Sequence, residues 1–484
     1  MNSLPIYYTL DVKFTCSSQG AYMQRFYAGI LNPIYKHFTC RIDRGTRFAL
    51  VFFFIALMNG ILIFDKNPAE THNFQREIIV SVLILLITVF SVNGELKPIK
   101  WNTAVFCPFL LFGFSILAVS FIHSTGLVLL AVEYIVLLPA LYFVWINRGD
   151  MHVLFSTISL TVVFEGILDL VYCFILSEQA HAFVYVDRYA GNAGGPNQFG
   201  EIGVAIMIAG LFILVTYRTD LIGCILSSAG IGIGVSFVIL SGSRTSMLAE
   251  MVCVLSVVLY GIKLIALRKD FTKEHLSRLV IALLLAAVVL FIGLQLDNIY
   301  YKSLQRQNED VSVSALNDSF ATIVGTVAET GQPEEQNATS ITDRFGFHGD
   351  INSYSSGRIA LWKLYIDNFA PLGKDDFWEP GNPEGKIHIF PAHNNIIEYT
   401  YRCGYVTGAV YLVLYIIIGV AGLRLLFGSK HTEYYKIFCI MCIGAFSVNA
   451  LIEWAALLTK PTICMYYLSL APIMGESIHP FQDS

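Results

Sequence analysis

The chain has 484 residues, of which 55% are hydrophobic and only 14% are charged. A soluble protein of this length would carry about 25% charged residues, so the composition excludes an ordinary soluble domain and predicts a membrane protein that crosses the bilayer many times. The formal net charge of -5 says little by itself, because the distribution of the charges along the chain is more informative.

Residues 1–47 precede the first long apolar stretch and are mixed in character and basic. A cleavable signal peptide would show a short charged start followed by a clear apolar core, which this segment lacks. The sequence therefore predicts a cytoplasmic N-terminal tail with an interfacial segment around "AYMQRFYAGILNPIY".

Apolar stretches long enough for spanning helices recur along the rest of the chain, since a helix needs about 20 residues to cross the apolar core of a bilayer. We predict spans at residues 48–64, 78–93, 102–122, 126–146, 152–177, 198–216, 221–240, 246–267, 279–296, 404–427, 436–455 and 460–475. The expected fold class is thus an all-α polytopic membrane protein with about 12 transmembrane helices. Residues 48–296 hold helices 1–9, residues 404–475 hold helices 10–12, and residues 476–484 form a short C-terminal tail.

Lysine and arginine set the predicted orientation, because they concentrate in cytoplasmic connections. With the N-terminus inside, the inner connections hold Lys97, Lys100, Arg148, Arg218, Arg268, Lys269, Lys273, Arg278, Arg424, Lys430 and Lys436. The short outer connections hold few basic residues. This asymmetry is consistent along the chain.

Residues 297–403 form one long polar segment, which this topology places outside as a large extracytoplasmic loop. Its second half contains a predicted short helix, "SSGRIALWKLYIDNF", which Ser355 or Ser356 can cap and which ends before Pro371. Such a helix could lie on the membrane surface.

The first of three polar groups on the outer side is "DRYAGNAGGPNQFGEIG", from Asp187 to Gly203. Pro196 can start the following helix, which places Asn197 in its first turn, where anions are favoured. Arg188 adds a cation. The alternative is an ordinary glycine-rich loop.

The second group is "LSGSRTSML", where Arg244 lies between two apolar spans close to the outer interface. The hydroxyls of Ser243 and Thr245 flank it, and a fixed guanidinium with hydroxyl neighbours matches a phosphate group. The alternative is an arginine that simply extends its charged end to the interface.

The third group combines Arg358 from "SGRIALW" with His393 and Asn394 from "PAHNN". Arg358 begins the predicted loop helix, where its charge opposes the helix dipole, so its position indicates a use other than helix stability. The alternatives are an ordinary loop arginine and a histidine that only caps the next helix.

Two other sets of acidic residues suggest different functions. Asp375, Asp376 and Glu379 in "GKDDFWEP" carry oxygen ligands of the kind that Mg²⁺ or Ca²⁺ prefers, although exposed acidic runs are usually only solvated. Within the spans, the acidic residues Glu133, Glu165, Asp169 and Glu201 favour a transporter or flippase.

The order and sidedness of these motifs resemble the O-antigen ligase and Wzy-type O-antigen polymerase superfamily. The resemblance is carried by "SGSRTSML" after a span, then "SGRIALW", then "PAHNNIIEYTYRCGYVTGAVYLV", together with about twelve spans and a large late outer loop. It covers roughly residues 185–425 in its motifs.

The resemblance implies a GT-C-like membrane glycosyltransferase of the cytoplasmic membrane, with its active site on the outer face and no metal or cofactor. Such proteins move a glycan from a polyprenyl (undecaprenyl) diphosphate carrier to an acceptor hydroxyl. The implied catalytic residues are Arg244, Arg358 and His393. Arg188, Asn197, Ser243, Thr245 and Asn394 are the implied diphosphate- or substrate-binding residues.

The chemistry of these residue types agrees with that reaction. Two arginines can stabilise the negative charge that develops on a leaving diphosphate, and a histidine can accept the proton of the acceptor hydroxyl. We expect a polymerase that joins lipid-linked repeat units into a surface polysaccharide, with a ligase that moves the glycan to lipid A–core, a protein or another anchor as the alternative. A non-catalytic assembly scaffold is a third possibility.

The expected partners follow from the same reaction. They are the lipid-linked glycan donor, a glycan or lipid acceptor and membrane lipids, and they could include a chain-length regulator and a flippase. No nucleic acid is expected.

Overall fold

The structure is a computed structural model. It describes residues 16–64, 74–123, 127–173, 184–185, 188–193, 195–217, 220–268, 280–281, 284–292, 295, 358–374, 392–427, 433–453, 458 and 460–475. Within these residues the chain is almost entirely helical, and its strands are the two-residue β1 (Val184–Tyr185) and β2 (Arg188–Tyr189), which pair antiparallel.

Residues 16–268 contain a series of helices, most of which are about 20 residues long. In chain order they are α1 (Cys16–His37), η1 (Thr39–Arg41), α2 (Arg44–Phe64), α3 (Phe74–Ser91), α4 (Thr103–His123), α5 (Val128–Val132), η2 (Glu133–Leu137), α6 (Leu138–Arg148), α7 (Met151–Val171), α8 (Pro196–Thr216), α9 (Leu221–Ser241) and α10 (Arg244–Arg268). The second half adds α15 (Arg358–Asp367), α16 (Asn395–Phe427), α17 (Tyr435–Ile452), α18 (Pro461–Ser469) and α19 (Ala471–Met474).

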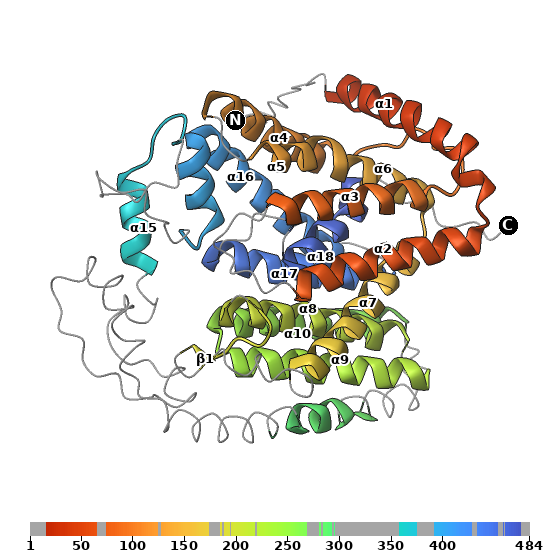
Figure 1. Cartoon of the computed structure of the whole chain (residues 1–484), viewed down its shortest axis with the longest axis vertical. Helices are drawn as coiled ribbons and strands as arrows, with labels where there is room; N and C mark the ends of the chain where they lie inside the picture. Colours follow the sequence, from red (N-terminus) through yellow and green to blue (C-terminus); the bar gives the residue numbers. More distant parts are fainter. Residues whose placement is uncertain are drawn as a thin grey trace, which may run out of the picture.

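The long helices form a bundle in which the C-terminal helices connect two groups of earlier helices. In Figure 1, α8, α9 and α10 make up one side of the bundle, α1 to α6 lie on the other side, and α16 to α18 lie between them. The short helix α15 lies at one end of the bundle, beside the beginning of α16. Among the nine long apolar helices, however, α8 is the most buried and α16 the least buried.

Nine helices within the described residues are long and apolar enough to cross a membrane. They are Arg44–Phe64, Thr103–Ile122, Val128–Arg148, Met151–Val171, Pro196–Thr216, Leu221–Ser241, Arg244–Lys263, Asn395–Phe427 and Tyr435–Ile452. Each corresponds to one of the predicted spans. The prediction of an all-helical protein with many membrane-spanning helices is therefore confirmed for these nine helices.

The other three predicted spans are matched less completely. The span at 78–93 corresponds to α3, which has 18 residues. The span at 460–475 corresponds to the shorter helices α18 and α19, which are separated at Leu470. Of the span at 279–296, residues 280–281, 284–292 and 295 are described and helical. Most of the predicted outer loop lies outside the described residues.

Glycines let α8 and α9 approach closely along their lengths. A Cβ atom built on Gly203 would lie 2.7 Å from the carbonyl oxygen of Gly234, and one on Gly210 would lie 2.7 Å from the amide nitrogen of Ile231. Small residues at such positions are typical of contacts between membrane helices, where close backbone approach replaces the hydrophobic driving force. This contact fixes α8, whose first turns carry part of the candidate site.

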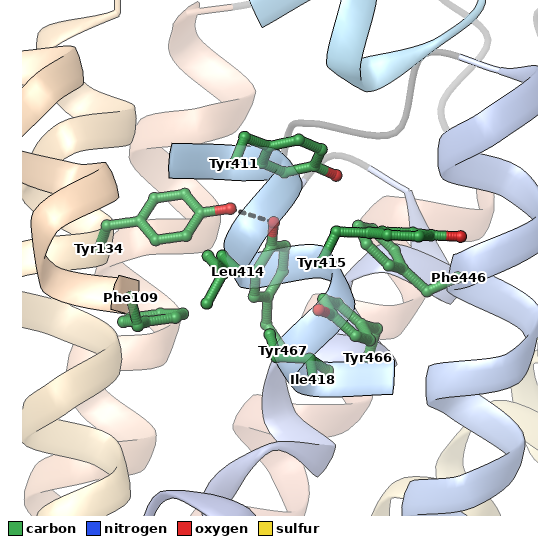
Figure 2. A pocket seen from close by; sticks show the side chains of 9 residues that line it. All are labelled: Phe109, Tyr134, Tyr411, Leu414, Tyr415, Ile418, Phe446, Tyr466 and Tyr467. Atoms are coloured by element: carbon green, nitrogen blue, oxygen red, sulfur yellow. Dashed lines mark hydrogen bonds between the residues drawn. The ribbon is translucent and has the colours of Figure 1, made fainter. Parts of the chain in front are cut away.

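The interior of the bundle contains a group of tyrosines, and several of their hydroxyl groups are paired. Figure 2 shows Tyr134, Tyr411, Tyr415, Tyr466 and Tyr467 around a small cavity, with a hydrogen bond between the hydroxyls of Tyr134 and Tyr467. A buried phenol needs such a partner, because an unpaired polar group in an apolar interior is costly. The paired rings give the helices that carry the site a well-packed support.

Residues 16–37 of the predicted tail form α1, which packs on the bundle. Gln24 donates to the carbonyl of Ile99 over 2.6 Å, and Tyr27 donates to the carbonyl of Ile135 over 2.9 Å. The opposite face leaves Tyr22 and Phe26 exposed. This mixture of a docked face and an exposed aromatic face is what an interfacial segment requires.

The predicted boundary between the outer loop and the span at residue 404 falls on a break in α16. Gly404 has φ 81° and ψ 173°, so the helix from Asn395 stops there and a new helical direction begins. The turn after α15 fits into the break, with the amide of Tyr405 donating to the carbonyl of Pro371 and the amide of Lys374 donating to the carbonyl of Arg402, both over 3.3 Å. The break therefore fixes α15 against the bundle.

Gly404→Ala is expected to destabilise the protein by about 2 kcal/mol or more, because a side chain at positive φ is strained and its Cβ would lie 2.3 Å from the carbonyl oxygen of Pro371. The matched control is Gly419→Ala in the same helix, where the added Cβ meets nothing within 4 Å. Thermal unfolding of the purified protein in detergent should separate the two variants. Equal transition temperatures would contradict the proposed role of the break.

Candidate functional site

Glu453, immediately after α17, is the centre of the candidate site. Its Oε1 accepts a hydrogen bond from Asn197 Nδ2 over 3.0 Å, its Oε2 contacts His393 Nδ1 over 2.9 Å, and its carboxylate forms an ion pair with Arg358. We refer to Asn197, Arg358, His393 and Glu453 as the Glu453 cluster. Three residues predicted from separate motifs are thus brought together by a fourth that the sequence analysis did not select.

The charge state of Glu453 determines which ring nitrogen of His393 carries the proton. Burial raises the pKa of Glu453. The hydrogen bond from His393 and the charges of Arg358 and Lys460 together lower the pKa by more than burial raises it, so the resulting pKa lies below the ordinary value. An ionised carboxylate only accepts hydrogen bonds, so Nδ1 of His393 carries the proton in this contact. In a neutral His393 the lone pair is therefore on Nε2, the nitrogen that can act as a base.

His393 is held in an unusual backbone conformation. Its φ is 50°, and among the described residues it is the one residue other than glycine with a positive φ. The next residue, Asn394, caps α16 by accepting from the amides of Ile396 and Ile397 over 3.0 and 3.1 Å, and it donates to the carbonyl of Leu451 over 3.0 Å. Asn394 therefore joins the start of α16 to the end of α17, and the strain at His393 is maintained by contacts on both sides.

Arg358 reaches Glu453 because α15 is docked on the first part of α16. Trp362 donates to the carbonyl of Ala392 over 2.7 Å, and the rings of Tyr365 and Tyr401 meet edge to face with centroids 4.7 Å apart. One face of the predicted loop helix is therefore used for contact with the bundle. The docking turns the first residue of α15 toward the end of α17.

A second carboxylate fixes the segment that leads into His393. Glu398, one turn into α16, accepts from the amide of Ala392 over 2.7 Å and forms an ion pair with Arg402. Glu398 is only 1% exposed, so these bonds are shielded from water. The residue before His393 is thereby tied to the helix that follows it.

A buried ion pair adjoins the Glu453 cluster. Lys460, just before α18, lies 2.9 Å from Glu201, which follows Asn197 by one turn on α8. The other carboxylate oxygen of Glu201 has no hydrogen-bond partner among the described residues. Glu201 had supported a transporter hypothesis, and the structure places it in an ion pair beside the candidate site.

Lys460→Met is expected to destabilise the protein by about 3–5 kcal/mol, because it leaves the carboxylate of Glu201, which is 2% exposed, without its cation. Adding Glu201→Gln to this variant should restore much of the loss. The control is Lys436→Met, whose partner Glu433 is 44% exposed and stays solvated, so its effect should be below about 1 kcal/mol. Thermal unfolding in detergent measures all three, and equal losses for Lys436 and Lys460 would refute the expectation.

The arginine of the second motif begins α10, close to the same end of α8. Ser243 precedes it and accepts from the amide and the hydroxyl of Ser246 over 3.3 and 3.0 Å, so it caps α10. A Cβ on Gly200 would lie 2.6 Å from Ser246 Oγ, which shows how tightly this turn packs on α8. Arg244 is half-buried there, and Gly200 lies one helical turn from Asn197.

The remaining predicted site residues are placed less completely. Thr245 is buried at 4% exposure in the first turn of α10. Arg188 lies in β2, and its side chain is outside the described part of the structure. The acidic stretch with Asp375, Asp376 and Glu379 also lies outside it. Among the residues that are described, no group of three or more metal-ligating side chains is found.

The acidic residues inside the spans have local contacts. Glu133 accepts from Ser81 Oγ over 2.7 Å, and Asp169 accepts from the thiol of Cys173 over 3.4 Å. The carboxylate of Glu165 lies near Gly60, where an added Cβ would be 3.5 Å from it. One carboxylate oxygen of Asp169 has no hydrogen-bond partner among the described residues, so these contacts satisfy the acids only in part.

Glu453 and Lys460 were missed, although the sequence contained a signal for them. They stand in "VNALIEWAALLTKP", where an acid interrupts the end of one apolar span and a lysine precedes the next. A charge at such a position favours a functional site when a partner of opposite charge is available. Many residues of opposite charge in the sequence could have paired with them. In the structure Glu453 pairs with Arg358 and His393, and Lys460 pairs with Glu201.

Comparison with known proteins adds an independent observation. The family model described as O-Antigen ligase matches residues 229–412, a segment that contains Arg244, Arg358 and His393. No curated protein matches the sequence. The nine long apolar helices and this match together indicate an integral membrane protein of the glycosyltransferase type that acts in O-antigen assembly. Residues 229–412 are thus similar to an O-antigen ligase domain, and this match supports the resemblance of the chain to the O-antigen ligase and polymerase superfamily.

Proposed function

We propose that this protein transfers a glycan from a polyprenyl diphosphate carrier to an acceptor hydroxyl on the outer face of the cytoplasmic membrane, and that the acceptor is another lipid-linked repeat unit. The proposal rests mainly on the Glu453 cluster, in which one buried carboxylate holds a histidine, an arginine and an asparagine from three different elements. The protein would then be a polysaccharide polymerase.

The two arginines would stabilise the leaving diphosphate. Glycosyl transfer breaks the bond between the sugar carbon and the diphosphate oxygen, so negative charge develops on that oxygen. A guanidinium has five N–H donors, and the pairing of Arg358 with Glu453 leaves others for a phosphate oxygen. Arg244, at the start of α10, would supply the second cation, with Ser243 positioning it as the helix cap.

His393 would accept the proton of the acceptor hydroxyl as that oxygen attacks the sugar carbon. The contact between Nδ1 and Glu453 directs the basic lone pair to Nε2, and the side chain is about one quarter exposed, so a substrate can reach it. Glu453 would act as a positioning residue that also stabilises the protonated imidazole. Asn197 would complete the arrangement by holding Oε1 of Glu453.

The topology proposed from the charge distribution agrees with this chemistry. The N-terminus would be cytoplasmic. The end of α17 and the starts of α8, α10 and α15 would face outward, where lipid-linked glycans are joined. The segment 297–403 would be the extracytoplasmic loop, and a flippase and a chain-length regulator are the partners that such a reaction would require.

Transfer with a defined substrate tests the proposal. Purified protein would be mixed with one polyprenyl diphosphate oligosaccharide, and the products separated by gel electrophoresis and mass spectrometry. A ladder of longer glycans still attached to diphosphate is the expected result. Transfer only to lipid A–core or a protein acceptor would identify a ligase instead, and the absence of any glycan transfer in either assay would contradict the proposed enzyme.

A further inference from the structure

A basic groove lies where four helices begin or end, far from the Glu453 cluster. It encloses a volume of about 380 Å³, which is in the size range of small-ligand sites. It is lined by Arg44, Gly45, Arg47, Phe48, Phe90, Val92, Asn93, Arg148, Asp150 and Val153. These residues come from the start of α2, the end of α3, the end of α6 and the start of α7.

The groove is at the opposite end of the bundle from the candidate site. The ring of His152, at the start of α7, lies 6.1 Å from that of Tyr217, at the end of α8, whereas Asn197 is at the beginning of α8. The 21 residues of α8 span about 30 Å, the thickness of the apolar core of a bilayer. The groove therefore lies near one membrane interface and the Glu453 cluster near the other.

Three arginines and one aspartate give the groove a positive charge. Arg148 is paired with Asp150 over 2.6 Å, and Arg47 donates to the carbonyl of Val92 over 2.7 Å and to the side chain of Asn93 over 3.1 Å. These contacts hold two guanidinium groups in place, while Arg44 is exposed at the rim. Fixed guanidinium groups recognise phosphate oxygens through paired charge-assisted hydrogen bonds.

An apolar strip continues from the groove along α2. Phe48 lines the groove and is 38% exposed, and Phe52, one turn further, is 39% exposed on the same side of the helix. Val153 of α7 is similarly exposed at the groove. A ligand whose charged end lies among the arginines would therefore have an apolar surface directly beside it, in the direction of the membrane interior.

We propose that the basic groove binds the phosphate headgroup of an anionic glycerophospholipid, with an acyl chain lying along Phe48 and Phe52. The combination of a positive pocket at an interface with an apolar strip matches a lipid better than a free phosphate, because a free phosphate has no apolar part that could contact the strip. This site is separate from the proposed glycan transfer, so either proposal can fail without the other.

Native mass spectrometry of the full-length protein in a neutral detergent tests the proposal. Dioleoylphosphatidylglycerol, dioleoylphosphatidylcholine and inorganic phosphate are titrated separately. The wild type should bind one phosphatidylglycerol at least about tenfold more tightly than phosphatidylcholine, a difference of about 1.4 kcal/mol. Arg44→Glu should lower the affinity for phosphatidylglycerol about tenfold. Arg41→Glu, which makes the same charge change at an exposed residue outside the groove, should lower it less than twofold.

Each other outcome overturns the proposal. Equal binding of the two lipids, or equal losses for Arg41→Glu and Arg44→Glu, would show a nonspecific surface effect. Displacement of phosphatidylglycerol by millimolar inorganic phosphate would identify a free anion site. Phe48→Ser provides a second variant that keeps all charges, and it should weaken lipid binding while leaving any binding of inorganic phosphate unchanged. Circular dichroism confirms that each variant retains its helices before the titrations are compared.

Discussion

Replacing Glu453 with glutamine is expected to lower the rate of glycan transfer by about 10³-fold while leaving the amount of protein in the membrane nearly unchanged. The amide is close in size to the carboxylate, so the packing at the end of α17 is preserved. It can donate to Nδ1 of His393 or accept from it, however, and it no longer stabilises the protonated ring. Loss of an equivalent orienting carboxylate in serine proteases costs about 10⁴ in rate, which sets the scale of the expected effect.

The matched control for this variant is Glu433→Gln. Glu433 also forms an ion pair, with Lys436, but it lies before α17 at the other end of that helix and is 44% exposed. Its replacement should change the transfer rate less than twofold. The rates are measured with purified protein and a polyprenyl diphosphate oligosaccharide, and comparable losses in the two variants would contradict a specific role for Glu453.

Replacing His393 is also expected to have a large effect, a loss of about 10²–10⁴-fold in transfer rate, because the acceptor hydroxyl then lacks its base. Two substitutions separate this chemical effect from the backbone strain at φ 50°. His393→Gln keeps the strain, whereas His393→Gly relieves it, so the glycine variant should be at least as stable as the glutamine variant toward heat. Both should be inactive to the same degree.

The control for His393 is His37→Gln, which changes an exposed histidine at the end of α1. This variant should transfer glycan at the wild-type rate. Substantial activity in either His393 variant would show that another group removes the proton. A glycine variant with restored activity would show that only the backbone conformation matters.

The pH dependence of stability provides a separate test of the ion pairs around Glu453. Because the pKa of Glu453 is lower in the folded protein than the ordinary value of 4.5, its contribution is fully present above that value and is lost as the pH falls through the folded pKa. The melting temperature of the wild type should therefore fall more steeply below pH 4.5 than that of Glu453→Gln. Parallel curves would indicate that Glu453 is not ionised in the folded state.

The features that depend on local sequence could be predicted. Apolar length gave the positions of nine long helices, Pro196 gave the first residue of α8, and the break at Gly404 coincides with the predicted end of the loop. The short helix at Arg358 was also predicted from its spacing and its stop signal. Each of these follows from a pattern that lies within about twenty residues of chain.

The features that depend on distant contacts could not be predicted in the same way. Glu453 lies 60 residues after His393 and 256 residues after Asn197, and many other charged residues could have paired with them. The docking of α15 depends on the turn at Gly373 fitting against the break at Gly404. The spacing of apolar residues in the sequence does not indicate such a contact. The buried pair of Lys460 and Glu201 was likewise hidden, because an acid within an apolar span also favours transport functions.

The central claim is that Glu453 and His393 act as one unit in glycan transfer, and a double-mutant cycle tests it most directly. The value of kcat/KM is measured for the wild type, Glu453→Gln, His393→Gln and the double variant with one polyprenyl diphosphate oligosaccharide. Residues that act together are strongly non-additive, so the double variant should be about as slow as the slower single variant. Losses that multiply in the double variant would contradict the claim and indicate independent roles for the two residues.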